Sequence, residues 1–185
     1  TTIHSLGCFE VLLDGKPIKW NRSKSKELLA YLLHFEGQRR TKYKLCEDLW
    51  PEYEPKKALV NLQTAICSLR KSLGDIGRED IKIEFFEESY TLKLGMVVWD
   101  ACEFERFYNA VKENRDISLL QKAVVLYQGD YMGNEDWIWA QLTAESFSRK
   151  YQEILKMLAE KSFEERSFNK TVEVIMQLAR IQAID

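Results

Sequence analysis

Residues 55–74, PKKALVNLQTAICSLRKSLG, place hydrogen-bonding groups and cations at helical spacing. At about 100° per residue, leucines and an isoleucine form one stripe, and the polar side chains fall opposite it: Lys57, Asn61, Thr64, Ser68 and Lys71. This polar face contains no carboxylate, whereas a surface helix that only has to be soluble usually mixes Glu with Lys. One interpretation is a helix that reads DNA, because amides and hydroxyls reach base edges and lysines neutralise phosphate. The other is a half-buried helix with an ordinary hydrated face.

The first interpretation predicts a division of roles at duplex DNA. We expect four side chains to face the major groove: Asn61, Thr64, Ser68 and Lys71. Lys57 and Arg70 are expected at the phosphate backbone, where each cation adds to the salt dependence of binding. Arg70 lies only about 40° from the apolar stripe, so a structural ion pair is its alternative role.

A basic block surrounds this helix in an otherwise acidic chain. The net charge is −2, but residues 16–71 contain 13 basic and 6 acidic side chains. Further phosphate candidates lie around the starts of two predicted helices: Arg22, Lys24, Lys26, Arg39, Arg40, Lys42 and Lys44. Helix N-termini add backbone donors there. A solvated surface charge is the alternative for each single residue, and the cluster as a group indicates nucleic acid.

Residues suited to catalysis or metal binding are sparse. The two histidines, His4 and His34, have no Cys, Asp or Glu at metal-ligand spacing. The chain contains no GxxxxGK[ST], GxGxxG or GxSxG motif. A thiol site that combines His34 with Cys46 or Cys67 is the remaining enzymatic alternative, against buried structural roles for the same side chains. The sequence therefore predicts no enzyme, no catalytic residue, no cofactor and no metal.

Composition favours a folded cytoplasmic protein. With 185 residues, 45% of them hydrophobic and 30% charged, the chain can bury a core in one or two domains. No apolar run approaches the length of a membrane span, and the opening TTIHSLGCFEVLL lacks the features of a signal peptide. The cysteines, Cys8, Cys46, Cys67 and Cys102, lie in segments typical of strand or helix, which predicts buried free thiols in a reducing cytosol.

Two hairpins are predicted within residues 1–98, one near the beginning and one near the end. Asp14-Gly15 between strand-like runs is typical of a tight turn and predicts the first. Alternation of apolar and polar residues on both sides of Glu87-Glu88-Ser89 predicts the second.

Three helices are predicted between these hairpins, over residues 24–35, 42–50 and 55–73. Asn21 or Ser23 can cap the first and Thr41 the second. Hairpin, three helices, hairpin is the order of a winged helix, in which the third helix enters the major groove and the last hairpin is the wing.

From Trp99 onward the pattern is wholly helical. Apolar and aromatic residues at helical spacing predict helices over about 102–111, 119–127, 137–164 and 170–183. Helix pairs of this kind indicate a tetratricopeptide-like stack. We therefore predict two domains, a winged helix over 1–98 and a helical domain over 99–185.

Several motifs lie in the order found in one known family. Residues 5–50 contain an LG-F strand, a D-G hairpin and a basic segment before a Leu-rich helix, and residues 66–71 match an I-S-R-L-R-K core. In these features the chain resembles the OmpR-type winged helix of the antibiotic-regulatory-protein (SARP) activators. The remainder resembles the bacterial transcriptional activator domain (BTAD), a tetratricopeptide-like module, through Asp100, Phe104-Glu105, Ala123, Leu126-Tyr127, Gly129-Asp130, Trp139, Tyr151 and residues 158–174.

The resemblance implies an α+β N-terminal winged helix-turn-helix followed by an all-α tetratricopeptide-like domain. Family members usually continue with more helices, so it implies a truncated second domain. Some relatives carry a phosphoacceptor receiver domain, as response regulators of two-component systems do. Two departures concern the site. The wing tip reads Glu87-Glu88-Ser89-Tyr90 where the family commonly has an Arg and a Gly-Tyr step, and Ser68 replaces the family's Arg.

The function expected from these features is sequence-specific transcriptional regulation, with activation favoured. The expected partners are double-stranded DNA, RNA polymerase and a second copy of the chain. The alternative is a protein-interaction scaffold whose winged helix has little DNA affinity, which the acidic wing tip would allow.

Overall fold

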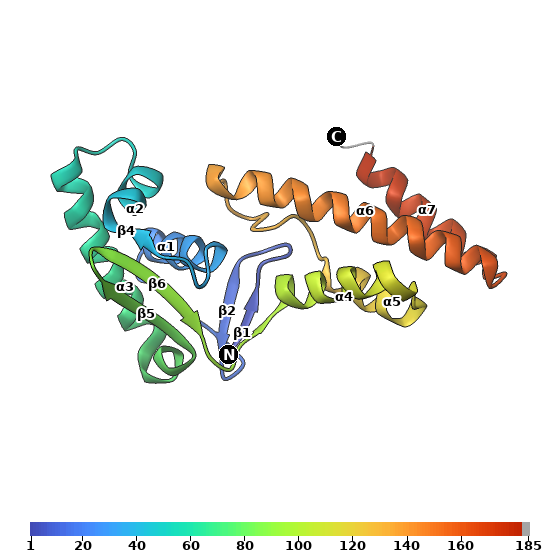
Figure 1. The fold of residues 1–185 in the computed structure, drawn as a ribbon, viewed down its shortest axis with the longest axis horizontal. Coiled ribbons are helices and arrows are strands. Elements are labelled where there is room, and N and C mark those ends of the chain that lie inside the picture. Colours follow the sequence, from blue (N-terminus) through green and yellow to red (C-terminus); the bar gives the residue numbers. More distant parts are fainter. Residues whose placement is uncertain (183–185) are drawn as a thin grey trace. The chain divides into compact units, whose positions relative to one another are not determined.

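The computed structural model describes residues 1–182, except the side chains at 75–78 and 182 (Figure 1). The chain folds into two compact units. The first unit comprises Thr1–Ile3, Glu10–Val98 and Trp137–Trp139, and the second unit comprises His4–Phe9, Trp99–Asp136 and Ala140 onward. The chain therefore passes from the first unit to the second between Val98 and Trp99. Two short segments depart from this division, because 4–9 belongs to the second unit and 137–139 to the first. The functional domain ranges 1–98 and 99–185 stay a prediction.

The first unit has the order of elements expected of a winged helix. Its strands are β1 (Thr2–His4), β2 (Glu10–Leu13), β3 (Lys16–Pro17), β4 (Arg40–Thr41), β5 (Ile81–Phe86), β6 (Ser89–Leu94) and β7 (Val98–Trp99). Its helices are α1 (Ser23–His34), α2 (Lys42–Leu49) and α3 (Pro55–Asp80). Two sheets result, with strand orders β3-β2-β1-β7 and β4-β6-β5.

Both predicted hairpins are present. In the first, β2 and β3 pair antiparallel around Asp14 (φ 49°) and Gly15 (φ 73°). In the second, Phe86 pairs with Ser89, so the turn consists only of Glu87 and Glu88, and Ser89 belongs to the strand. Glu87 and Glu88 both have positive φ, 44° and 60°, a conformation that suits Asn and Gly better than Glu.

The three predicted helices are confirmed, with one wrong cap. Thr41 caps α2 by accepting a hydrogen bond from the Lys44 backbone N–H at 3.1 Å. Neither Asn21 nor Ser23 caps α1, because the position before its first turn is occupied by Arg22, which makes no side-chain cap bond. Gly74 interrupts α3 with a non-helical conformation (φ 60°, ψ −164°), which is the end expected from the sequence.

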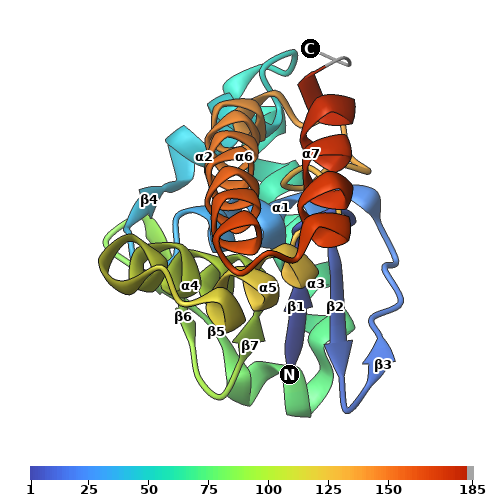
Figure 2. The ribbon, with the colours of Figure 1, turned by 90° about the vertical axis from the view of Figure 1, so that its right-hand side faces the viewer.

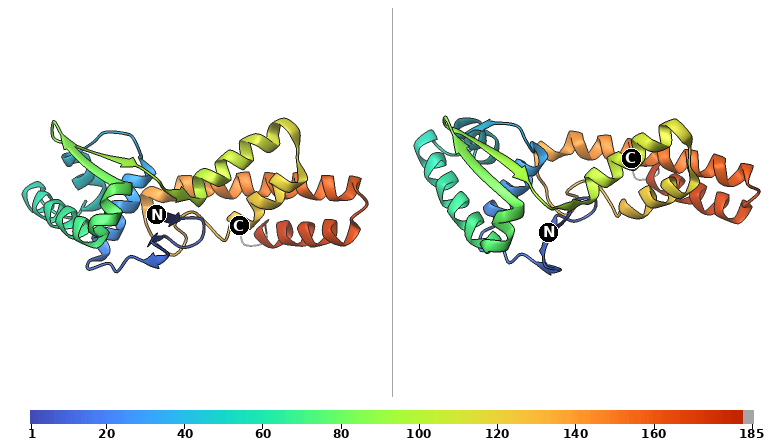
Figure 3. Two further views of the ribbon diagram at one scale, coloured as in Figure 1. Left: turned by 90° about the horizontal axis from the view of Figure 1, so that it is seen from below. Right: turned by 60° about the horizontal axis from the view of Figure 1, so that its bottom comes forward.

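Small side chains set the position of α3 against the rest of the first unit. Ala58 and Ala65 are 2% and 3% exposed, and they share the buried face with Leu62, Leu69 and Leu73. The Ser25 hydroxyl of α1 donates a hydrogen bond to the Ala65 carbonyl at 3.3 Å, so α1 and α3 lie close together. On another side of α3 lies the β5–β6 hairpin, as Figure 3 shows.

The second unit is helical, as predicted. It contains α4 (Asp100–Asn114), α5 (Ile117–Leu126), α6 (Gln141–Glu164) and α7 (Phe168–Gln182), with each helix packed on the next (Figure 2). The expected start of the long helix at 137 is wrong, because Ile138–Ala140 form a 3-10 turn before α6. The expected end at 183 lies outside the described residues.

A buried carboxylate joins the segment before β2 to α4. Asp100, 8% exposed, accepts hydrogen bonds from the backbone N–H groups of Ser5 and Leu6 and from the Ser5 hydroxyl, at 2.8 to 3.1 Å. The Trp99 indole donates to the same Ser5 hydroxyl at 2.8 Å. These bonds give Asp100, one of the residues behind the family resemblance, a structural role within the second unit.

The cysteine prediction is largely wrong. All four are free, but only Cys46 is buried, and Cys8, Cys67 and Cys102 are exposed. Burial raises the pKa of the Cys46 thiol, which makes it a poor nucleophile. Among the side chains that the structure describes, no cluster of His, Cys, Asp and Glu has the geometry of a metal site. None of the described helices is both long and apolar enough to span a bilayer.

Candidate nucleic-acid interface

The outer face of α3 is the candidate reading surface. Its exposed side chains are Lys56, Lys57, Val60, Gln63, Thr64, Cys67, Arg70 and Lys71. No carboxylate occurs on the helix between Pro55 and Gly74. The predicted absence of acids is therefore a property of the exposed surface as well as of the sequence.

Two of the predicted groove residues are not on this outer face. Ser68 is only 9% exposed, and its hydroxyl is buried with no hydrogen-bond partner among the described residues. Asn61, two helical turns earlier on the same side of α3, is half-buried. The expectation that Ser68 points outward is wrong because Ala58 and Ala65 are core residues. They rotate the buried face away from the stripe of large apolar side chains, and Ile66 marks its edge.

The same rotation brings forward residues that the sequence pattern missed. Gln63 and Cys67 lie on the exposed face with Thr64 and Lys71, and Val60 is 60% exposed. Gln63 offers an amide, the group that recognises adenine best. Counting alanines as core residues would have identified this face.

The cations of α3 differ in their contacts within the protein. Lys71 is exposed and has no ion-pair or hydrogen-bond partner within the described part of the chain. Lys57 lies 4.7 Å from the centre of the Tyr53 ring. Arg70 donates to the Ile83 carbonyl at 3.4 Å, so it contacts the hairpin through a backbone group. Thr64 donates to the Val60 carbonyl at 2.9 Å, which leaves its oxygen free to accept.

A shallow cavity of about 460 Å³ lies where α3 meets β5. Arg70 and Lys82 both line it, and Lys82 is exposed on β5 with no partner among the described side chains. The sequence pattern did not select Lys82, which follows the end of α3 by two residues and lines the same cavity as Arg70 from β5.

The phosphate candidates of α1 differ among themselves. Arg22 is exposed directly before the helix. Lys24 donates to the Leu49 carbonyl at 2.6 Å and forms an ion pair with Glu27 at 2.8 Å. Lys26 is half-buried and engaged with other groups of the protein. Arg22 is thus the candidate of this group that remains most accessible.

Arg40 points inward instead of toward solvent. Its guanidinium lies 3.4 Å from the centre of the Phe35 ring and donates to the Tyr31 hydroxyl at 3.0 Å. Tyr31 in turn donates to Asp48, and burial, followed by this carboxylate, raises the pKa of Tyr31. Burial and then the charge of Arg40 lower the pKa of the adjacent His34. Arg40 is therefore a structural cation.

The remaining candidates are paired with acidic groups of the same unit. Lys44 lies 2.8 Å from Asp48, and hydrogen bonding to this carboxylate raises its pKa. At the hairpin tip, Arg39 pairs with Glu87 at 3.0 Å and Lys42 pairs with Glu88, which raises the pKa of Lys42. The Lys42 backbone N–H also donates to the Glu88 carbonyl at 2.8 Å. The acidic wing tip therefore binds two of the predicted phosphate contacts.

Comparisons with known proteins give a limited set of relatives. No family model matches the chain. The transcriptional regulatory protein MoaR1, from Mycobacterium bovis (strain BCG / Pasteur 1173P2) and from Mycobacterium tuberculosis (strain ATCC 25618 / H37Rv), is 31% identical over 110 residues. That alignment covers 59% of this chain and 34% of MoaR1, so the chain matches about a third of the length of these curated relatives.

A solved structure has the same fold. The chain superposes on M. tuberculosis EmbR, solved in complex with a low-affinity phosphopeptide, with a TM-score of 0.68. The match covers 98% of this chain and 55% of the EmbR chain, at 18% sequence identity. At that identity the match concerns the fold, and it extends over both units of the chain.

Proposed function

We propose that this chain is a transcriptional regulator that binds duplex DNA, with the outer face of α3 in the major groove. The observation that carries the proposal is that face itself: exposed amide, hydroxyl and ammonium groups with no carboxylate among them. Thr64 and Lys71 keep the groove roles expected from the sequence, and Gln63 and Cys67 join them. Asn61 is proposed at the margin and Ser68 is withdrawn.

Phosphate contacts are proposed for four exposed cations on or near α3 and α1. These are Lys57, Arg70, Lys82 and Arg22. Such contacts position the helix on the duplex, and the groove residues select the sequence. The similarity to MoaR1, named a transcriptional regulatory protein, supports this assignment.

The finer family assignment belongs to the same proposal. We assign the first unit to the OmpR-type winged helices and the second to the bacterial transcriptional activator domains, acting in the cytoplasm. The second unit then makes protein contacts, either with RNA polymerase or with a second copy of the chain. Paired half-sites are the expected target of a dimer.

One observation favours a second function, the protein-interaction scaffold. Glu87 and Glu88 pair with Arg39 and Lys42, which lowers the positive charge that the wing can offer to phosphates. A scaffold would bind DNA weakly at every salt concentration. A DNA reader loses affinity steeply as salt rises, because counterions are released from the duplex on binding.

Selection from a random duplex pool at moderate salt separates the two functions. A reader enriches a short direct or inverted repeat, and a scaffold enriches none. With the enriched duplex, Lys71→Gln should weaken binding and flatten the slope of log K against log salt by about 1. Lys16→Gln is the matched control, because Lys16 is an exposed lysine on β3 and should leave the slope unchanged.

The native thiols provide an independent test of which face binds. Cys67 lies on the outer face of α3, and Cys8 is an exposed thiol of the second unit. The enriched duplex should slow alkylation of Cys67 by iodoacetamide and leave Cys8 unaffected. Equal rates for Cys67 with and without bound duplex would overturn the assignment of α3 as the reading helix.

A further inference from the structure

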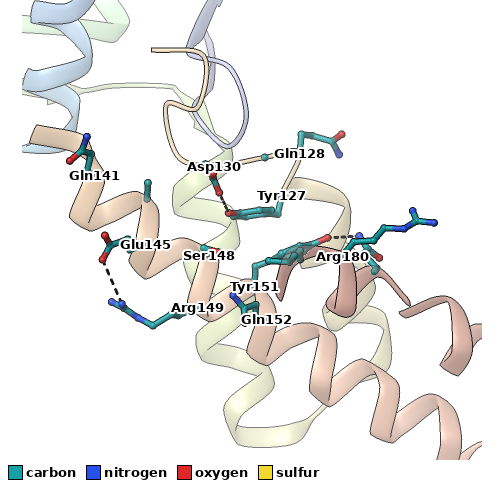
Figure 4. A pocket seen from close by; sticks show the side chains of 14 residues that line it. Tyr127, Gln128, Asp130, Gln141, Glu145, Ser148, Arg149, Tyr151, Gln152 and Arg180 are labelled. Atoms are coloured by element: carbon teal, nitrogen blue, oxygen red, sulfur yellow. Dashed lines mark hydrogen bonds and ion pairs between the residues drawn. The ribbon is translucent and has the colours of Figure 1, made fainter. Parts of the chain in front are cut away.

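The second unit contains a cavity of about 890 Å³ that the proposed DNA contacts do not use (Figure 4). Three elements line it: the loop after α5, the first half of α6, and the end of α7. This volume is in the range of ligand sites in proteins. All of its lining belongs to the second unit.

Two stacked tyrosines form the centre of the cavity. The rings of Tyr127 and Tyr151 lie against each other, as Figure 4 shows. Their centres are 4.1 Å apart and their planes are 14° from parallel. The Tyr127 hydroxyl donates to Asp130 at 2.9 Å, and the Tyr151 hydroxyl accepts from Gln177 at 2.6 Å. Burial raises the pKa of both phenols, so they are neutral near pH 7. The centre is therefore preorganised and uncharged.

Side-chain amides of α6 also line the cavity. Gln141 and Gln152 on α6 line the cavity and have no hydrogen-bond partner within the described residues. Each offers one acceptor and two donor hydrogens, which matches the N–H and C=O of a peptide group. They are eleven positions apart on α6, about 16 Å along the helix axis, which is the length of about five extended residues.

Two arginines, Arg149 and Arg180, also line the cavity. Arg180 has no ion-pair or hydrogen-bond partner among the side chains that the structure describes. Arg149 has Glu145 as its ion-pair partner at 3.9 Å, which is beyond hydrogen-bond distance. The other carboxylate of the lining, on Asp130, already accepts from Tyr127. Both guanidiniums thus keep donors for carboxylates of a ligand.

We propose that this cavity binds an extended acidic peptide segment of a partner protein. The separated amides would bind its backbone, and Arg149 and Arg180 would pair with its carboxylates. A single-stranded nucleic acid fits less well, because the tyrosines stack on each other and Tyr151 is only 4% exposed, which leaves little ring face for a base. The inference specifies the protein-contact part of the proposed function and does not depend on DNA binding.

The test is fluorescence anisotropy with three labelled octapeptides that alternate Ala with Glu, Gln or Lys. The Glu peptide should bind saturably, the Gln peptide at least tenfold more weakly, and the Lys peptide not at all. Arg180→Gln should weaken binding of the Glu peptide at least fivefold. Gln152→Ala should weaken binding of the Glu peptide and of the Gln peptide by factors equal to each other, because it removes a contact to the peptide backbone. Lys156→Gln is the control, because Lys156 is an exposed cation of α6 outside the cavity.

Several results would overturn the inference. These are no saturation by the Glu peptide up to about 1 mM, equal binding of all three peptides, or an equal effect of Lys156→Gln and Arg180→Gln. Tighter binding of a labelled oligothymidine at the same site would assign it to nucleic acid instead. Duplex binding measured on the same samples keeps a failure here distinct from a failure of the DNA proposal.

Discussion

The outer face of α3 and the surface formed by β4, the start of α2 and the hairpin tip are both rich in cations, but they differ in charge pairing. On α3, Lys71 has no acidic partner among the described residues. On the other surface, Arg39, Lys42 and Lys44 pair with Glu87, Glu88 and Asp48. Both surfaces belong to the first unit, so the comparison holds within one body. It teaches that the count of basic residues overstates the charge available to a ligand.

The exposed cations of α3 depend on the buried residues that hold this helix in place. Leu69 is fully buried, and Leu69→Ala should lower the free energy of unfolding by about 2–5 kcal/mol, because it leaves a cavity under the helix. Urea titration followed by circular dichroism measures the change. Leu142→Ala, at a leucine that is 78% exposed, should change it by less than about 0.5 kcal/mol. Equal effects of the two substitutions would contradict the burial of Leu69.

The cations near the hairpin tip can be freed from their acidic partners, which would make this surface resemble the outer face of α3. Glu87→Gln with Glu88→Gln removes the partners of Arg39 and Lys42. Affinity for duplex DNA should rise several-fold at moderate salt, and the slope of log K against log salt should steepen by about 2 if both cations reach phosphates. An unchanged slope in equilibrium titrations would mean that the hairpin tip does not approach DNA.

Substitution of the same two residues by Asn and Gly separates charge from backbone conformation. Glu87→Asn with Glu88→Gly should raise DNA affinity as the double Gln variant does, and should also stabilise the protein by about 1 kcal/mol, since both positions have positive φ. The double Gln variant should show no such gain in thermal melts. A gain in both variants would attribute the stabilisation to the charges.

The inward orientation of Arg40 predicts the smallest effect. Burial and the charge of Arg40 lower the pKa of His34 in the folded protein, so the unfolded imidazole binds a proton first as the pH falls. Stability should therefore drop as the pH falls below about 6.5. His34→Gln should show a smaller drop in melting temperature between about pH 7.5 and about pH 5.5. An equal drop in both proteins would exclude His34 as the source.

The order of elements could be predicted because short-range signals agree with the fold. Asp14-Gly15 marks one turn, Thr41 caps α2, and Gly74 breaks α3 as expected. The orientation of α3 could not be predicted from its large apolar residues alone. Ala58 and Ala65 are buried, and α1 approaches closely at Ala65, so the buried face of α3 depends on tertiary packing.

The ion pairs of the predicted phosphate contacts could not be predicted from the sequence pattern either. Arg39 and Glu87 are 48 residues apart, and only the pairing of β4 with β6 brings them together. Lys82 was missed for the same reason, since it reaches the neighbourhood of Arg70 through the contact of β5 with α3. Local spacing identifies which residues share one helix, and the sheet decides which helices and strands share a surface.

The separation of two residue sets along α3 has a practical consequence for engineering. Ala58, Leu62, Ala65 and Leu69 hold the helix in place, whereas Gln63, Thr64 and Cys67 lie outside and contribute little to the core. A library that randomises only the outer positions should therefore keep most members folded. Selection from such a library on chosen duplexes offers a route to regulators with new operators on an unchanged scaffold.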